Sequence, residues 1–370
     1  MSVEEETGEA SRPKTTVLIL TPFGFQGMGG IDRLMDEIRK RGDRLPDIEL
    51  QFLTTRGPGS LKWAPLCFAA AACRMILFRV TRGRCVCHVN LGSRGSTYRK
   101  LVLARLARLL GHTTVIHLHG ARFHLWYAGV HPLLRTAIRD MLHHAAAMVV
   151  LGSFWRDFAV IEVGLDPARV LVLPNASAQR PPRPEEDRVF RILFLGRLGA
   201  RKGVPVLIDA LGILGRTALD WQAVIAGDGD AEPFVTQAKT LGIAERVSFP
   251  GWLDDAAVND RLGHASVLAL PSELEGLPMS VIEAYAWGVP VIATPVGSVP
   301  DILQDGAQGL IVEIGDAAGL AAALERLARD PTLRRTMGEN ALRCHRERLE
   351  FDAYLTRLAD CWRAAAALRS

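Results

Sequence analysis

The stretch PSELEGLPMSVIEAYAWGVPVIAT, residues 271–294, has the pattern of a strand end, a loop, a helix, a tight turn and a second strand. Pro278 is expected in the first turn of the helix and Gly288 at its C-terminal cap, which leaves a helix of about ten residues between them. A loop that leads from a parallel strand into a helix lies at the carboxyl edge of its sheet, where α/β proteins bind ligands. The stretch therefore predicts an α/β domain with a ligand site at this loop.

Two carboxylates mark that site. Glu275 lies in the loop and Glu283 lies well inside the first turns of the helix, so both can reach one ligand lying across the helix start. A carboxylate that accepts two hydrogen bonds suits the vicinal hydroxyls of a sugar or a ribose. On spacing alone the alternative has even weight: Glu275 caps the helix and Glu283 is merely exposed.

Strands and helices alternate on both sides of this stretch, as they do in parallel sheets covered on both faces. Strands are expected in the second half at Phe190–Leu195, Gln222–Ala226, Val247–Phe249, Val267–Leu270, Val289–Ala293 and Leu310–Val312. The first half has the same pattern, with strands at Val17–Thr21, Ile48–Thr54, Val86–Leu91, Thr114–Leu118, Met148–Leu151 and Val170–Leu173, and helices at Ile31–Lys40, Leu66–Val80, Tyr98–Leu109 and Pro132–His143. Each half is thus a doubly wound, Rossmann-like unit.

The length of 370 residues also favours two domains, because single cores stop growing at roughly 250–300 residues. A polar segment with four prolines follows residue 173 and is expected to be the linker. The predicted organisation is a disordered N-terminus (1–13), an N-terminal domain (14–174), the linker (175–189), a C-terminal domain (190–350) and a C-terminal helix (351–370) that packs back on the first domain.

A second informative stretch, ILFLGRLGARKGV (192–204), is a strand followed by a glycine-rich loop. Gly196 permits close backbone approach to a ligand. Arg197 and Lys202 suit a diphosphate, the arginine through its planar fork and the lysine as a point charge. The alternative is that they are ordinary surface cations at a strand end.

Two further loops follow strands of the same sheet and are expected at the same edge. The segment from Gly227 to Asp230 and the loop that ends in Trp252 are interpreted as walls of a nucleobase pocket. Asp228 and Asp230 are also a candidate cation pair, but no third ligand follows at calcium-loop or magnesium-site spacing. A base-lining or structural loop is therefore favoured, and no metal site is predicted.

In the first half, a glycine-rich loop containing Gly29 and Gly30 joins the first strand to the first helix, and its amides suit an anion. It fails as a dinucleotide fingerprint, because Asp32 stands where the third glycine belongs. His119 ends a strand near the expected crevice and suits a hydroxyl or a phosphate, although a histidine satisfied within the core is the better interpretation of it in isolation. No zinc site is expected, because the histidines lack helical pairing with an acid or C-x-x-C partners.

The charge and cysteine content of the chain limit the kinds of partner and compartment that are expected. The net charge is +4, and arginines gather in the first half, either as a solvated face or as a site for anionic ligands or a membrane surface. Nucleic acid is not expected, since no basic stripe with interleaved aromatics occurs. The start of the chain is acidic and has no secretory signal, and the six cysteines show neither a disulfide framework nor metal spacing. A cytoplasmic protein with reduced thiols is predicted.

The apolar run from Trp63 to Ala72 is followed by Arg74 and Arg79, so it is expected to be too short to span a bilayer. An apolar run beside cations is also typical of interfacial helices. Two interpretations therefore stay open: docking of Leu61–Phe68 with Arg74, Arg79, Arg82 and Arg84 on the inner face of an anionic membrane, or a crossover helix buried against its sheet.

Five motifs occur in one order: Gly196-Arg-Leu, Lys202-Gly203, Gly227-Asp-Gly, Phe249-Pro-Gly-Trp, and the stretch from Glu275 to Glu283. With them the chain resembles the retaining glycosyltransferases of family four, glycosyl transferases group 1, over nearly its whole length. The resemblance implies the GT-B fold, in which two Rossmann-like domains face each other across a cleft. Pro174-Asn175 is similar to a Pro-Asn-Gly strand end of the family, with Ala176 in place of the glycine.

The resemblance also implies residue roles. Arg197 and Lys202 would hold the donor diphosphate, Glu283 the ribose hydroxyls and Glu275 the hydroxyls of the transferred sugar, with His119 beside that sugar. The further donor-binding residues would be Gly29, Gly30, Gly196, Gly227, Trp252, Gly276, Leu277 and Pro278.

The function implied is a retaining, metal-independent hexosyltransferase of polysaccharide or glycoconjugate synthesis. It would use a UDP- or GDP-sugar, no cofactor, and a glycan, lipid-linked or small-molecule acceptor. A catalytically silent nucleotide-sugar-binding protein and a nucleotide-sugar epimerase of the same fold are the alternatives, because a fold does not fix a function.

Overall fold

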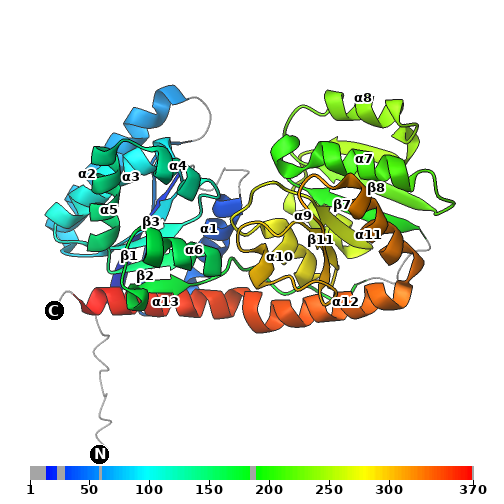
Figure 1. The fold of residues 1–370 in the computed structure, drawn as a ribbon. Coiled ribbons are helices and arrows are strands. Elements are labelled where there is room, and N and C mark those ends of the chain that lie inside the picture. Colours follow the sequence, from blue (N-terminus) through cyan, green and yellow to red (C-terminus); the bar gives the residue numbers. More distant parts are fainter. Residues whose placement is uncertain (1–13, 23–29, 58–60, 184–188, 369–370) are drawn as a thin grey trace, which may run out of the picture. The chain divides into compact units, whose positions relative to one another are not determined.

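The computed structural model describes residues 14–22, 30–57, 61–183 and 189–368. Their secondary structure forms two six-stranded sheets with helices packed around each (Figure 1). Every strand pairing recorded for β1 and within the second sheet is parallel, which confirms the predicted doubly wound α/β class. The predicted disorder of residues 1–13 and the proposed role of Gly29 lie outside the described residues.

The first sheet has the order β2-β1-β3-β4-β5-β6. Its strands are β1 (Thr15–Thr21), β2 (Ile48–Thr54), β3 (Val86–Leu91), β4 (Thr113–Leu118), β5 (Ala147–Val150) and β6 (Val170–Val172). The helices of this half are α1 (Gly30–Lys40), α2 (Ala64–Arg82), α3 (Gly95–Leu109), α4 (Phe123–Gly129), α5 (Pro132–His144) and α6 (Ser153–Asp157). The short helices α4 and α6 were not predicted, because seven and five residues are too few to show a helical period.

The second sheet has the order β12-β11-β10-β7-β8-β9. Its strands are β7 (Phe190–Leu195), β8 (Trp221–Ala226), β9 (Val247–Gly251), β10 (Val267–Leu270), β11 (Val291–Ala293) and β12 (Gly309–Ile311). The helices are α7 (Val204–Leu214), α8 (Glu232–Thr240), α9 (Asp255–His264), α10 (Met279–Ala286), α11 (Ala317–Arg329), α12 (Pro331–Cys344) and α13 (Phe351–Ala367). All six strands predicted for this half are present.

The placement of Pro278 in the first turn of α10 is wrong by one residue. Its φ of −71° suits a helix, but its ψ of 130° is extended, so Pro278 is the N-cap and Met279 begins the helix. Gly288, with φ +64°, takes the left-handed conformation expected after a helix C-terminus. Strand β11 begins at Val291 and not at Val289, after Pro290, which lacks a backbone N–H for the ladder.

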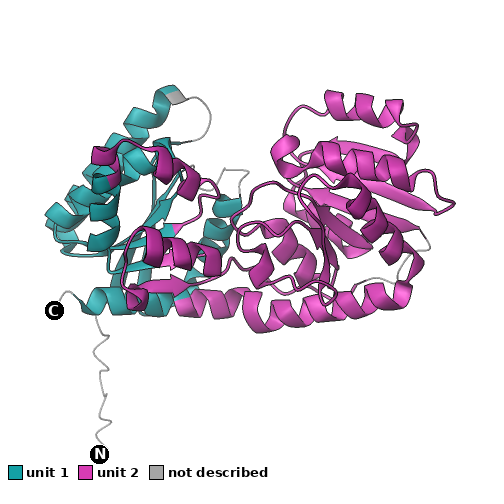
Figure 2. Ribbon diagram, viewed as in Figure 1, with its two compact units in different colours: residues 1–117, 136–148, 358–370 teal, residues 118–135, 149–357 magenta. Residues whose placement is uncertain are grey.

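The chain divides into two compact units, coloured in Figure 2. Unit 1 comprises residues 1–117, 136–148 and 358–370, and unit 2 comprises residues 118–135 and 149–357. The last part of α13 therefore belongs with the first sheet, as predicted for the C-terminal helix. Within unit 1, Trp362 donates to His88 Nδ1 over 3.1 Å, and Arg363 pairs with Asp47 at 2.8 Å. The domain boundaries drawn from composition remain a prediction.

Helix α2 corrects one expectation. Arg74 and Arg79 do not interrupt it, and it runs for 19 residues with a mean hydropathy of 1.5 over its most apolar window, of which only 17% is buried. By length and composition alone, a helix of this kind meets the requirement for crossing a membrane.

The fully buried His88 predicts acid sensitivity of unit 1. Its ring accepts the hydrogen bond of Trp362 and is therefore neutral, and burial lowers its pKa to about 3. The unfolded chain takes up this proton near pH 6.5, whereas the folded chain resists it, so stability is complete above pH 6.5 and falls as the pH drops towards 3. A shift of this size corresponds to on the order of 5 kcal/mol.

Urea unfolding between pH 7 and pH 4 measures this effect. The His88→Gln variant is expected to lose less stability over that range than the unaltered chain, and the exposed His264→Gln on α9 is expected to lose as much. Parallel pH profiles for the His88 variant and the unaltered chain would contradict the assignment.

Candidate functional site

The candidate site is built on the loops that follow β7 and β10 in unit 2. Lys202, in the short turn after β7, donates to Glu275 Oε1 over 2.5 Å. Ser272, which follows β10, donates to the same oxygen over 2.8 Å. The side chains of Lys202 and Glu275 are only 15% and 8% exposed, so each needs the opposite charge that the other supplies. The two residues predicted to share a donor therefore do lie together.

Both charged groups retain unused hydrogen-bonding capacity. Among the described residues, Glu275 Oε2 has no recorded donor, and the Lys202 ammonium has Glu275 as its only recorded acceptor. An ammonium carries three N–H groups and a carboxylate oxygen two lone pairs. The pair therefore has two N–H groups for an anion and one oxygen for hydroxyl donors. Ser272 was not predicted, and its position three residues before Glu275 was the only signal.

Backbone contacts fix the two loops against each other. Glu273 N–H donates to Arg201 C=O over 2.9 Å, which ties the β10 loop to the Lys202 turn. Gly203 has φ +72°, and a Cβ on it would lie 1.9 Å from the Pro271 carbonyl oxygen, so only glycine permits this approach. On the other side, Ser298 N–H donates to Gly276 C=O over 2.7 Å. The site is therefore held by main-chain geometry that a side chain at residue 203 would break.

Arg197 behaves differently from Lys202. Its side chain is 71% exposed, and its Nε lies 3.7 Å from Asp228 Oδ2, a contact that contributes little stability at such exposure. The guanidinium is therefore available to an anion from solvent. Gly227 approaches the loop of Gly196 closely, since a Cβ on Gly227 would lie 1.8 Å from the Gly196 carbonyl oxygen. The loops that follow β7 and β8 therefore lie close together at the carboxyl edge of the second sheet.

The remaining predicted residues of the C-terminal half occupy the same edge of the sheet. Trp252 follows β9 and is 47% exposed, and Glu283 is half-buried on α10. Within the described part of the chain, no group of three or more His, Cys, Asp or Glu side chains is arranged to hold a metal ion.

Residues from the first half of the sequence complete unit 2 beside Gly276 and Leu277. A Cβ on Gly276 would lie 3.1 Å from Leu151 Cδ1 and 3.5 Å from the His119 carbonyl oxygen. Asn175 Nδ2 donates to Leu277 C=O over 3.0 Å. The half-buried His119 thus lies next to the loop that carries Glu275. Gly30 is the first residue of α1 and belongs to unit 1, so its predicted role stays a prediction.

Asn175 is a residue whose role sequence reasoning missed. It is buried, and its Oδ1 has no hydrogen-bond partner among the described residues. Ala176, the departure from the family pattern, is also buried and is not among the described residues with positive φ. The strand end therefore needs no glycine at residue 176, and Asn175 holds the Leu277 carbonyl through its hydrogen bond.

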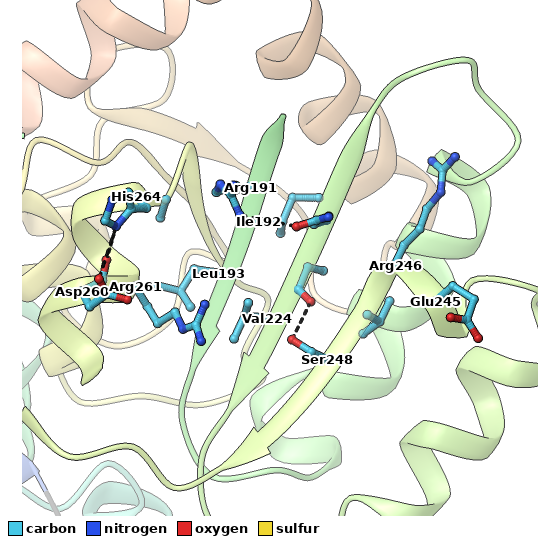
Figure 3. A pocket seen from close by; sticks show the side chains of 14 residues that line it. Arg191, Ile192, Leu193, Val224, Glu245, Arg246, Ser248, Asp260, Arg261 and His264 are labelled. Carbon is cyan, nitrogen blue, oxygen red and sulfur yellow. Dashed lines mark hydrogen bonds and ion pairs between the residues drawn. The ribbon is translucent and has the colours of Figure 1, made fainter. Parts of the chain in front are cut away.

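A cavity of about 390 Å³ lies elsewhere in unit 2 (Figure 3). It is lined by the first residues of β7, β8 and β9, such as Arg191 and Gln222, and by Arg261 of α9. Lys202 and Glu275 follow the opposite, carboxyl ends of their strands. The cavity is thus distinct from the candidate site.

Comparison with known proteins agrees with this geometry. A family model described as "Glycosyl transferase 4-like domain" matches residues 31–176, and one described as "Glycosyl transferases group 1" matches residues 175–343. The α-D-kanosaminyltransferase of Streptomyces kanamyceticus is 30% identical over 64% of this chain and 66% of its own length. A D-inositol 3-phosphate glycosyltransferase of Streptomyces avermitilis is 36% identical over 47% of this chain and 39% of its own. The chain thus aligns with less than two thirds of each of these relatives.

Solved structures share the whole fold. The sucrose-phosphate synthase of Thermosynechococcus elongatus superposes with a TM-score of 0.80 at 18% identity, covering 96% of this chain and all of that one. The Anabaena protein Alr3699/HepE has a TM-score of 0.73 at 18% identity, covering 94% and 98% of the two chains. These likenesses identify the two-sheet architecture as the GT-B fold. Since the two family matches together run from α1 to the end of α12, the chain belongs to the group 1 glycosyltransferases.

Proposed function

We propose that this protein transfers a hexosyl group from a UDP- or GDP-sugar to a glycan, lipid-linked or small-molecule acceptor, with retention of anomeric configuration. The observation that carries the proposal is the buried cluster of Lys202, Glu275 and Ser272, which keeps two N–H groups and one carboxylate oxygen for a ligand. A nucleoside diphosphate sugar offers the matching groups, because it carries an anionic diphosphate next to a ring of hydroxyls.

The roles follow from charge and exposure. Lys202 and the exposed Arg197 bind the diphosphate and stabilise the charge that grows on it as the glycosidic bond breaks. Glu275 accepts hydrogen bonds from the sugar hydroxyls, which orients the ring, while Glu283 binds the ribose and His119 the sugar. The acceptor hydroxyl attacks on the face from which the diphosphate departs, and a diphosphate oxygen takes the hydroxyl proton.

The similar proteins support a nucleotide-sugar donor. The Anabaena protein Alr3699/HepE is described in complex with UDP and glucose and in complex with UDP-glucose. The curated relatives transfer to different acceptors by their names, among them D-inositol 3-phosphate and L-malate. Fold and family therefore favour the donor class, and the acceptor of this chain is left to experiment. The six free cysteines favour the cytoplasm, where thiols stay reduced.

A thermal-shift screen of UDP, GDP and their sugars tests donor binding, because a ligand that binds the folded state raises the apparent Tm. The preferred donor is then incubated alone and with candidate acceptors, and the anomeric configuration of the product is determined by NMR. A transferase consumes donor only when an acceptor is present. Conversion of the donor alone would indicate an epimerase, and binding without turnover by any acceptor a silent binding protein.

Metal independence is a separate prediction. Since Lys202 and Arg197 supply the positive charge that a divalent cation supplies elsewhere, EDTA is expected to leave at least half of the activity. Loss of activity in EDTA with recovery on adding Mn²⁺ would overturn this prediction and would favour a cation site at Asp228 and Asp230.

A further inference from the structure

Helix α2 presents a continuous apolar stripe to solvent. Its side chains recur at intervals of three and four residues, which places them on one face of a helix. Trp63 is 62% exposed, Leu66 61%, Leu77 60% and Val80 78%. The opposite face of the helix, with Ala71, Met75 and Phe78, is buried in unit 1. The stripe consists of Trp63, Leu66, Ala70, Cys73, Leu77 and Val80.

Helix α3 extends the apolar surface. It packs beside α2 in unit 1, and both helices lie in the upper left of Figure 1. Tyr98, Val102 and Leu109, which follow one another at helical spacing, are between 49% and 85% exposed. We call the stripe and these three residues the α2–α3 face. Single exposed apolar residues are ordinary on soluble proteins, but two adjacent helices with such faces form a patch that marks an interaction surface.

The charge around this face is predominantly positive. Residues 50–139 contain 14 arginines and lysines and no aspartate or glutamate, although the whole chain has a net charge of only +4. Arg74 on α2 and Arg105 on α3 are exposed, and no ion pair is recorded for them within the described ranges. Of the arginines suggested by sequence, Arg79 donates to the Leu110 carbonyl and Arg82 pairs with Glu49. Arg74 was suggested by the sequence and Arg105 was not.

Two other occupants fit less well. Helix α2 joins β2 to β3, and both of these strands pair with β1 in the parallel sheet. If α2 crossed a membrane, its buried face would have to leave the core of unit 1. A second copy of the chain docked on the same face would bring two predominantly cationic surfaces together, because residues 50–139 contain no acid and the flanking Glu49 and Asp140 already pair with Arg82 and Arg108. A surface of anionic lipids complements both the apolar stripe and the charge.

We propose that the α2–α3 face binds the surface of an anionic bilayer, with α2 lying in the plane of the interface. The apolar stripe enters the boundary between headgroups and acyl chains, while Arg74 and Arg105 contact anionic headgroups. The purpose of such docking rests on the proposed function, since it would bring the enzyme to a lipid-linked acceptor. The binding itself needs neither donor nor acceptor and is measured without them.

Sedimentation of the full chain with vesicles tests the proposal. The protein is expected to pellet with phosphatidylcholine vesicles that contain phosphatidylglycerol at low salt, and to stay in solution with phosphatidylcholine alone or at high salt. The Leu66→Ser/Leu77→Ser variant is expected to lose at least about tenfold in partitioning, because two exposed apolar side chains leave the interface. Arg74→Ser/Arg105→Ser is expected to lose roughly tenfold at low salt.

A matched control is provided by Ile161→Ser/Ile314→Ser, which removes two exposed apolar side chains of unit 2 and is expected to sediment normally. Transfer to a water-soluble acceptor should be the same in the Leu66/Leu77 variant and the unaltered chain, so a failure of docking is distinguishable from a failure of the proposed function. Quenching of tryptophan fluorescence by brominated lipids gives an independent readout. Since Trp63 is proposed to enter the bilayer interface, Trp63→Phe should remove most of the fluorescence that these lipids quench.

Three results would overturn the proposal. The protein remains in the supernatant with anionic vesicles at low salt; the stripe and control variants sediment alike; or analytical ultracentrifugation shows a dimer that Leu66→Ser/Leu77→Ser abolishes, which would assign the face to a second copy of the chain.

Discussion

Lys202→Ala is expected to lower kcat/KM for sugar transfer more than tenfold. The change removes a charge-assisted hydrogen bond to the leaving diphosphate, which contributes about 1.5–3 kcal/mol. It also removes the cation that pairs with Glu275, whose side chain is 8% exposed, so the Tm should fall as well. Arg197→Ala should lower transfer by a similar factor but leave the Tm nearly unchanged, because Arg197 is 71% exposed.

Steady-state kinetics and thermal unfolding of both variants measure these effects. Lys239→Ala, which removes an exposed lysine of α8, is the control and should change neither quantity. The double variant Lys202→Ala/Glu275→Gln separates the two roles of the pair. Its Tm should recover, since no unpaired buried charge remains, while its transfer stays low. Near-normal turnover in both Lys202→Ala and Arg197→Ala would refute the donor assignment.

Gly203→Ala is expected to be among the most destabilising single substitutions in unit 2. A Cβ at residue 203 would lie 1.9 Å from the carbonyl oxygen of Pro271, a backbone atom that cannot turn away. Relief of this clash has to move either the Lys202 turn or the start of the β10 loop, so transfer should fall with stability.

Gly242→Ala isolates the steric part of this effect. Gly242 has φ +70°, nearly the φ of +72° at Gly203, but a Cβ there would meet nothing within 4 Å. Both variants incur about 1–2 kcal/mol for a left-handed alanine. Only Gly203→Ala adds the clash, of roughly 1–3 kcal/mol or more. Equal urea midpoints for the two variants would mean that the approach of Gly203 to Pro271 has no energetic consequence.

The fold was predictable to a large extent because the hydrophobic pattern of each strand is local. Buried runs such as Phe190–Leu195 and Val267–Leu270 appear at the predicted residues, since a parallel strand covered on both faces must be apolar throughout. The helix after Pro278 and the left-handed Gly288 followed from turn chemistry. Helices α4 and α6 did not, because their few residues are helical only where the surrounding structure buries them.

The candidate site was predictable as a set of residue types but not as a set of contacts. The glycine-rich turn with Lys202 and the loop with Glu275 were evident from the sequence, yet their direct pairing was not. Ser272 and Asn175 were missed, because a serine three residues before a glutamate and an asparagine after a proline carry no distinctive pattern. Both act through partners that only folding supplies, namely Glu275 and the Leu277 carbonyl.

The strands, the carboxyl-edge loops and the residue types that a diphosphate and a sugar require were evident without a structure, because they depend on local periodicity and on motifs that occur in a set order. The folded chain was needed to show that Lys202 neutralises Glu275 across 73 residues, and that α2 buries Met75 while exposing Leu66 and Leu77. Pairing and burial depend on distances between segments that are far apart in the chain, and a local pattern does not contain those distances. A helix that is apolar on every side shows no preference in its sequence for the face that the sheet will cover.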